Sequence, residues 1–366
     1  MMKRKKRGIA LVAVLWVALT LFAWFGPVKE LSLAERRPLQ QIPELSKDSL
    51  LSGSFMEKFE EYTLDQFPLR DSFRTLKSLF AYNILGQKDN NGIYVAGGYA
   101  AKLEYPLSAP SLKHALNRFN TVYDRYLKDT GSKIFLSVIP DKGYYLAAEN
   151  GYPAMDYGKL MADLGAGMPW AQAVDITKTL DITDYYYSDT HWRQEKLIPT
   201  AKLLCEAMGI EPPKAEDFTA TLASQSFYGV YYGQAALPMK PEELYIMEST
   251  LLSSCRVYNH ETASYQSVYD LQKLSGADPY EVFLSGPQAL LTIENPNAAT
   301  DKELILFRDS FGSSLAPLLI QGYKTVTLVD IRYVSSAILD RYLDFHGQDV
   351  LFAYSTLVLN SSTSLK

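Results

Sequence analysis

The sequence predicts an α/β protein that has a central parallel sheet and is preceded by one membrane-spanning helix. The C-terminal part alternates strand-like and helix-like segments, which is the pattern of βαβ units and a parallel sheet. The first 28 residues hold a cationic stretch and then an apolar one, which is the pattern of a segment inserted into a membrane. With 366 residues, 47% of them hydrophobic, the chain is long enough to bury one large core.

The N-terminal segment predicts a signal anchor. "MMKRKKR" places five cations before the uncharged stretch Gly8 to Val28. As a helix that stretch is roughly 31 Å long, close to the roughly 30 Å hydrocarbon core of a bilayer. The cations favour a cytoplasmic N-terminus, so the bulk of the chain is expected outside the cell membrane, held by a single pass. A cleaved signal peptide is the alternative, but the small residues Ser32 and Ala34 lie well past the apolar stretch.

Charge and cysteine content limit the function classes. Without the five leading cations the chain has 31 Lys and Arg against 41 Asp and Glu, a balance of −10. This argues against a general nucleic-acid-binding or anionic-lipid-binding surface. Cys205 and Cys255 are compatible with one disulfide or with two free thiols. Zinc-ligand spacing is not found in the sequence, so we expect a mechanism without metal or cofactor.

The chain organises into a short leader and one large domain. We expect a helix near Phe55 to Asp65, a buried strand in "KIFLSVIPDK", and a helix after His191 that ends at Gly209. "ELILFRDS", "SSLAPLLIQGY", "KTVTLVDIRY" and "DVLFAYSTLVL" then predict strand, helix, strand and strand. The expected parts are a basic cytoplasmic tail (1–7), a transmembrane signal anchor (8–28), a linker (29–50) and a catalytic domain (51–366) with an irregular, tyrosine-rich elaboration at about 212–296.

Ser310 lies where a predicted strand ends and a helix begins, in "LILFRDSFGSSLAPLL". Ligands of parallel sheets gather at the carboxyl ends of strands, and a helix N-terminus there stabilises negative charge. A serine at this turn meets the needs of a nucleophile whose attack creates an oxyanion. Ser and Asp are also preferred helix caps, so the motif alone leaves both interpretations open.

The base that such a serine needs is offered by "YYYSDTHWRQ". Asp189 and His191 lie two residues apart, so one loop holds carboxylate and imidazole close together. The chain has only four histidines, which leaves His191 few rivals. As the alternative, Asp189 caps the following helix and His191 hydrogen-bonds in a pocket.

Together, D-T-H-W at Asp189 to Trp192 and R-D-S-F at Arg308 to Phe311 resemble the DHHW and alginate O-acetyltransferase-like group of the SGNH-hydrolase superfamily. The resemblance implies a three-layer, SGNH-hydrolase-like α/β domain that is circularly permuted, because the Asp-His motif precedes the serine. It also extends over further segments, "LSGSFMEKFEEYTLDQFPLRDSF", "VIPDKGYY", "DPYEVFLSG", "VDIRY" and "DVLFAYS".

The resemblance implies that Ser310 is the nucleophile, that His191 is the general base and then acid, and that Asp189 orients His191. Asp309 is then structural. Arg308 replaces the glycine of the superfamily's G-D-S block, so oxyanion geometry does not follow from the motif. Gln194-Glu195-Lys196 likewise replaces the small residue expected after D-x-H-W.

Three strand-end residues are candidates for substrate binding. They are Arg332, which precedes Tyr333, and Tyr354 and Lys142. For Arg332 the alternative is a structural salt bridge to Asp330. The 26 tyrosines offer stacking faces for sugars, although most aromatic side chains belong to the core.

The function implied by the resemblance is an extracytoplasmic O-acetyltransferase that modifies a cell-envelope or secreted polysaccharide. The resemblance further implies a membrane-bound O-acyltransferase as the acetyl supplier. One alternative is a carbohydrate O-acetyl esterase that uses the same site with water as acceptor. Another is a non-catalytic polysaccharide-binding scaffold, in which Ser310 and His191 would lie far apart.

Overall fold

A computed structural model describes residues 2–366, with side chains from Arg7 onward. The chain divides into two compact units. One unit comprises the residues up to Asn91 together with Tyr232–Pro238, and the other comprises Gly92–Tyr231 and Met239–Lys366. The boundary at residue 91 lies inside the segment 51–366 that the sequence assigns to one domain, and the predicted domain bounds stay a prediction.

The first unit begins with helix α1, Met2–Phe25. Arg7–Phe25 is long and apolar enough to cross a membrane, which suits either an anchor or a signal sequence. The helix ends at Phe25, three residues before the predicted end at Val28, because Gly26 and Pro27 do not favour continuing a helix. Of the predicted cytoplasmic tail, 1–7, the side chains of residues 1–6 lie outside the described part of the chain.

After α1 and up to Asn91, this unit consists of a hairpin and three helices. Strands β1 and β2 pair antiparallel within the predicted linker 29–50, and α3 matches the helix expected near 55–65. The elements are β1 Leu31–Ser32, β2 Arg37–Pro38, α2 Lys47–Leu51, α3 Ser54–Asp65 and α4 Arg70–Asn83.

The second unit is built on an 8-stranded sheet with the order β10-β9-β11-β13-β12-β14-β5-β6. Pairing is parallel from β13 through β12, β14 and β5 to β6, and antiparallel from β13 through β11 and β9 to β10. The antiparallel extension is formed by part of the region 212–296. The strands are β5 Ile134–Ile139, β6 Gln172–Ala173, β9 Arg256–Asn259, β10 Ser264–Gln266, β11 Leu290–Glu294, β12 Glu303–Arg308, β13 Thr325–Val329 and β14 Asp349–Ser355.

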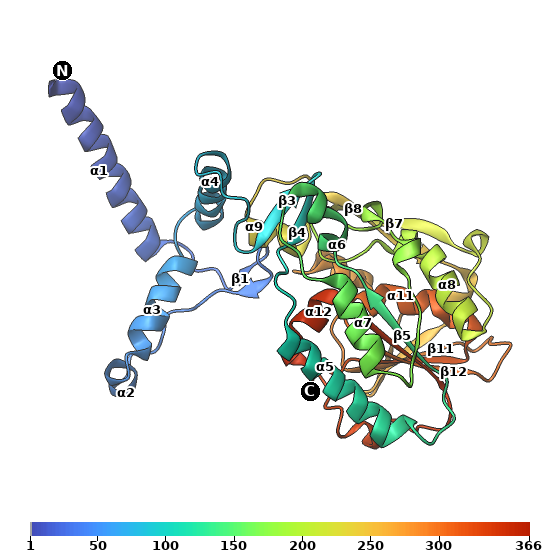
Figure 1. Cartoon of the computed structure of the whole chain (residues 1–366). Helices are drawn as coiled ribbons and strands as arrows, with labels where there is room; N and C mark the ends of the chain where they lie inside the picture. Colours follow the sequence, from blue (N-terminus) through green and yellow to red (C-terminus); the bar gives the residue numbers. More distant parts are fainter. Residues whose placement is uncertain (1) are drawn as a thin grey trace. The chain divides into compact units, whose positions relative to one another are not determined.

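Helices cover both faces of this sheet (Figure 1). Strand β12 shows how the sequence produces two cores, because Leu304 and Leu306 face one core while Ile305 and Phe307 face the other. The predicted three-layer α/β fold is confirmed. One core holds α8 Ile198–Met208 and α11 Phe311–Leu319, and the other holds α5 Ala109–Val122, α7 Tyr157–Gly167 and α12 Thr356–Asn360.

Smaller elements complete the chain. Hairpins β3–β4 and β7–β8 form separate two-stranded sheets. Their bounds, with those of the short helices, are β3 Ile93–Ala96, β4 Tyr99–Lys102, α6 Lys142–Leu146, β7 Thr219–Phe227, α9 Val230–Ala235, β8 Glu242–Glu248 and α10 Thr250–Ser254.

Candidate active site

Ser310 occupies the turn between β12 and α11, as the N-cap residue of that helix, and is partly exposed. The turn is fixed by its neighbour Asp309, which is fully buried. Asp309 Oδ1 accepts the N–H of Phe311 at 3.0 Å, and its Oδ2 accepts the N–H of Ser355 at the end of β14 at 2.7 Å. The Asp309 carboxylate thereby caps α11 and ties it to the neighbouring parallel strand.

The structure brings Ser310, His191 and Asp189 together. Ser310 Oγ lies 2.8 Å from His191 Nε2, and His191 Nδ1 lies 2.6 Å from Asp189 Oδ1. Asp189 is fully buried and His191 is 6% exposed. The Asp189 carboxylate also accepts the backbone N–H of His191 and, through Oδ2, that of Val230 at 2.9 Å. A carboxylate on Nδ1 favours the tautomer whose Nε2 accepts a proton from the hydroxyl.

Aromatic packing holds the His191 ring in place. Tyr280 stacks on it, with ring centroids 3.8 Å apart and planes 5° from parallel, and Phe311 lies 4.9 Å away. Ser314 of α11 fixes two aromatic residues, because its Oγ lies 2.8 Å from the Tyr280 hydroxyl and 2.9 Å from Trp192 Nε1. Tyr280 was missed as a site residue, although it lies in "DPYEVFLSG".

The loop that carries Asp189 and His191 is held by a buried carboxylate. Glu242, at the start of β8, is 7% exposed and accepts the backbone N–H groups of Tyr187 and Ser188. The Ser188 hydroxyl also donates to it, at 2.6 Å. Sequence reasoning missed Glu242, because a charged residue at a strand end normally indicates a solvated surface.

Lys142 lies beneath the same loop and is 2% exposed. Its Nζ donates to the backbone carbonyls of Tyr186 at 2.9 Å and Tyr187 at 3.2 Å. Burial lowers the pKa of Lys142 to about 7, against the opposing effect of nearby carboxylates such as Asp189. In this structure Lys142 positions the loop, and its own side chain has almost no exposed surface that a substrate could contact.

Gly229 lets a neighbouring segment approach the loop closely. A Cβ on this residue would lie 2.2 Å from both the N and the Cα of Asp189. The Gly229 N–H donates to the Ser188 hydroxyl at 2.9 Å. This bond places the next residue, Val230, so that its N–H can donate to the Asp189 carboxylate. In the sequence, Gly229 is one of the turn residues of "SFYGVYYGQ", within the irregular region 212–296.

The other predicted substrate-binding residues are engaged within the protein. Arg332 is 16% exposed on its side chain and binds Asp330 through Nε at 2.9 Å and Nη2 at 2.6 Å. Burial lowers the pKa of Arg332, but its hydrogen bonds to Asp330 reverse that shift and leave the pKa above its ordinary value. Arg308, which replaces the motif glycine, is fully buried, with Nη1 3.4 Å from the same Asp330. Tyr354 is fully buried against Phe119.

The tyrosines before Asp189 divide into two kinds. Tyr185 and Tyr186 are buried, whereas Tyr187 is 43% exposed and packs against Tyr99, with the two rings tilted by 31°. Only Tyr187 of the three therefore presents a substantial ring surface to solvent. Cys205 and Cys255 are free, buried thiols.

Comparison with known proteins agrees with the motifs. Residues 181–329, which hold both Asp189 and Ser310, match the family described as DHHW protein. The predicted resemblance to the DHHW family is confirmed. No curated protein matches the sequence.

Solved structures share the fold of this DHHW-like chain at low sequence identity. A DHHW family protein from Eubacterium siraeum is 20% identical with a TM-score of 0.62, over 75% of this chain and 94% of that one. PatB1 from Bacillus cereus is 16% identical with a TM-score of 0.56, over 73% and 96%. PatB1 with a sulfonyl adduct gives a TM-score of 0.55, at 16% identity over 73% and 97%.

Proposed function

We propose that this DHHW-like protein is an extracytoplasmic O-acetyltransferase that acts on a cell-envelope or secreted polysaccharide. The observation that carries the proposal is the hydrogen-bonded series Ser310 Oγ, His191 Nε2, His191 Nδ1 and Asp189 Oδ1, at 2.8 and 2.6 Å. A hydroxyl, a base and a carboxylate in this order are what nucleophilic acyl transfer requires. The choice of acetyl group and polysaccharide follows from the DHHW and alginate O-acetyltransferase-like resemblance.

In the first half reaction His191 Nε2 takes the proton of Ser310 as Oγ attacks the acetyl carbonyl. The carbonyl oxygen becomes an oxyanion beside the N-terminus of α11, where the helix dipole favours negative charge, although the Phe311 N–H is already bound to Asp309. The ester bond to the donor then breaks, His191 returns its proton to the leaving oxygen, and Ser310 carries the acetyl group. Asp189 holds the imidazolium formed in this step.

In the second half reaction a sugar hydroxyl takes the place of the leaving group. His191 removes its proton, the sugar oxygen attacks the acetyl-serine, and the proton passes to Ser310 Oγ as that bond breaks. Deacetylation by water, which would make the protein an esterase, follows the same steps. Exclusion of water from the second half reaction separates the two activities.

The proposed donor and location also follow from the resemblance and from α1. An acetyl group on the outer face of the membrane needs a supplier, and we assign this role to a membrane-bound O-acyltransferase. We place the second unit outside the cell, anchored by α1. In this assignment Lys142 supports the acceptor site through the loop carbonyls that it binds, Arg332 through Asp330, and Tyr354 through its packing on Phe119.

A sulfonyl fluoride tests the nucleophile without knowledge of either substrate, because it sulfonylates an activated serine and releases fluoride. The PatB1 adduct is a precedent in a protein of similar fold. We expect one adduct on Ser310 of the full-length chain in detergent, and none in Ser310→Ala or His191→Gln. Ser313→Ala, one turn along α11, is the matched control and should be labelled at the wild-type rate. Labelling of Ser310→Ala at that rate would exclude Ser310 as the nucleophile.

A second assay separates transferase from esterase. The wild-type chain and Ser310→Ala are given 4-nitrophenyl acetate as donor with an oligosaccharide acceptor, and acetylated acceptor and free acetate are both measured. We expect acetylated oligosaccharide from the wild type only. Release of acetate without acetylated acceptor contradicts the transferase proposal and favours the esterase.

A further inference from the structure

Helix α4 of the first unit turns its polar side inward. Arg74 Nη2 donates to the Gly233 carbonyl at 2.8 Å, and the Ser78 hydroxyl donates to the Ala235 carbonyl at 2.8 Å. Ser78 is fully buried, and Arg74 also lies 3.2 Å from Glu35. The side of the helix that would normally face water is therefore the side that packs.

The opposite side of α4 is apolar and exposed. Five residues at spacings of three and four form one stripe that includes both caps of the helix. We name them the α4 stripe. They are Leu69, Phe73, Leu76, Phe80 and Ile84, with exposures of 68, 43, 61, 52 and 68%. A continuous apolar stripe of this kind indicates a surface that is covered in the working protein.

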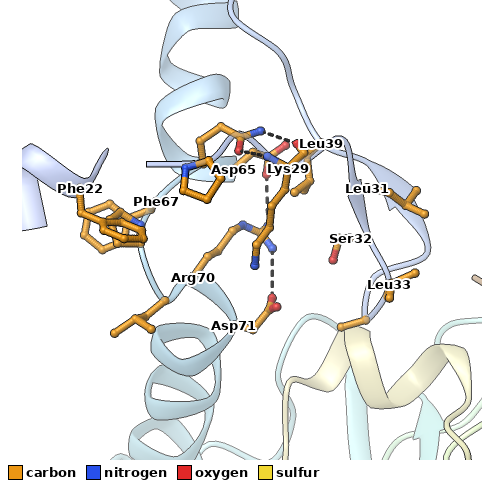
Figure 2. Close-up of a pocket in the computed structure, with 15 residues that line it drawn as sticks. Phe22, Lys29, Leu31, Ser32, Leu33, Leu39, Asp65, Phe67, Arg70 and Asp71 are labelled. Atoms are coloured by element: carbon orange, nitrogen blue, oxygen red, sulfur yellow. Dashed lines mark hydrogen bonds and ion pairs between the residues drawn. The ribbon is translucent and has the colours of Figure 1, made fainter. Parts of the chain in front are cut away.

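The start of α4 lies close to the end of the membrane-spanning segment. A cavity of about 540 Å³ is lined by Phe22 and Pro27 at the end of α1 and by Phe67, Leu69 and Arg70 at the start of α4 (Figure 2). Trp24, one residue before the end of α1, is 72% exposed, and tryptophan is enriched where a helix meets the membrane–water interface. If α1 crosses a bilayer, α4 begins at the level where α1 leaves it.

We propose that α4 is an interfacial helix, whose α4 stripe inserts between lipids of the outer leaflet of the same bilayer that α1 spans. The basic residues near its start are not available to attract anionic headgroups, because Arg70 pairs with Glu35 and Asp65. Lys77 is then the exposed cation of α4, so the apolar stripe drives insertion and zwitterionic lipid suffices. A second copy of the chain fits less well, because a stable protein interface uses about 20–30 residues on each side and the α4 stripe has five.

The test places a nitroxide spin label on the full-length chain in phosphatidylcholine liposomes. Single cysteines are introduced as Leu76→Cys and Phe80→Cys on the stripe, and as Asp71→Cys on the opposite side of the same helix. Asp71 is 61% exposed on its side chain and serves as the matched control. The native Cys205 and Cys255 are buried, and the chain without an added cysteine gives their background labelling. Power saturation then compares collision of each label with oxygen, which concentrates in lipid, and with a nickel chelate, which stays in water.

We expect the labels at 76 and 80 to collide at least several-fold more with oxygen than with nickel, and the label at 71 to show the reverse. Equal nickel access at all three positions would mean that the stripe faces water, which overturns the proposal. Labels at 76 and 80 that are shielded from both reagents would mean that protein covers the stripe, which overturns it equally. Since Ser310 takes no part, these outcomes are independent of the proposed acyl transfer.

Discussion

At the scale of single residues, Gly229 sets how closely the chain can approach Asp189. We predict that Gly229→Ala forces the two segments apart, because its Cβ would lie 2.2 Å from Asp189 backbone atoms. The contact between the Val230 N–H and the Asp189 carboxylate would then lengthen. A shift of about 1 Å in a catalytic group costs about 100-fold in rate, so we expect sulfonylation of Ser310 to slow by that order.

The control for this change is Gly165→Ala in α7. Its Cβ would have no neighbour within 4 Å, and the residue is helical, so alanine should be tolerated or slightly stabilising. Wild-type labelling in both variants would show that the close approach of Gly229 is not needed for the geometry of the site.

Lys142 predicts a pH dependence of stability. Its pKa falls to about 7 in the folded chain because of burial, from an ordinary value of 10.5. Between these two values the unfolded chain binds more protons, so the free energy of unfolding rises with pH by up to about 1.4 kcal/mol per unit. Below pH 7 the cost of burying the charged ammonium is fully present.

Lys142→Met keeps the aliphatic stem but cannot titrate, so its stability should lack this rise. Denaturant unfolding of the detergent-solubilised chain at several values between pH 6.5 and 8.5 measures the difference between the two proteins. We expect the unfolding free energy of the wild type, minus that of the variant, to increase with pH. A difference that stays constant would mean that Lys142 does not titrate in this range.

At the scale of elements, the first residue of β8 stabilises the loop before His191. Glu242→Gln replaces one carboxylate oxygen by a donor, so the N–H groups of Tyr187 and Ser188 and the Ser188 hydroxyl compete for a single acceptor. Each buried donor left unpaired costs about 1–3 kcal/mol, and we predict a loss of unfolding free energy of that size together with slower labelling of Ser310.

Glu243→Gln is the matched control, since the next residue of the same strand is exposed. Surface substitutions of this kind usually change stability by less than about 0.5 kcal/mol. Equal stability of the two variants in thermal unfolding would contradict the role assigned to Glu242.

These elements also show what the sequence could predict. The strands β5, β12, β13 and β14 are short, largely apolar runs, and the turn after β12 follows directly from such a pattern. Glu242, Gly229 and Tyr280 could not be assigned to the site, because they lie about 40 to 90 residues after Asp189 and no local pattern shows that these segments meet. Helix α4 could be predicted as amphipathic, but periodicity does not say which of its faces packs.

At the scale of the whole molecule, the packing of the first unit bears on the fate of α1. Cleavage after Ala34, the small-residue site nearest to α1, would remove strand β1 from its hairpin with β2. It would also make Glu35 the terminal residue, although its side chain lies within salt-bridge distance of Arg70 and Arg74. The backbone at Ala34 is packed as well, because a Cβ on Gly233 would lie 1.6 Å from its carbonyl oxygen.

We therefore predict that the chain keeps its N-terminal segment in cells. A C-terminally tagged chain should stay in the membrane fraction through an alkaline carbonate wash, and mass spectrometry should recover peptides that span Ala34 and Glu35. A mature chain that begins at Glu35 and is released by the wash would contradict the prediction. Retention has a consequence for the proposed chemistry, because an α1 that spans the membrane would tether the unit that carries Ser310 to it. Acetyl groups delivered across that membrane would then reach an enzyme held at high local concentration, whereas a released chain would meet them only by diffusion.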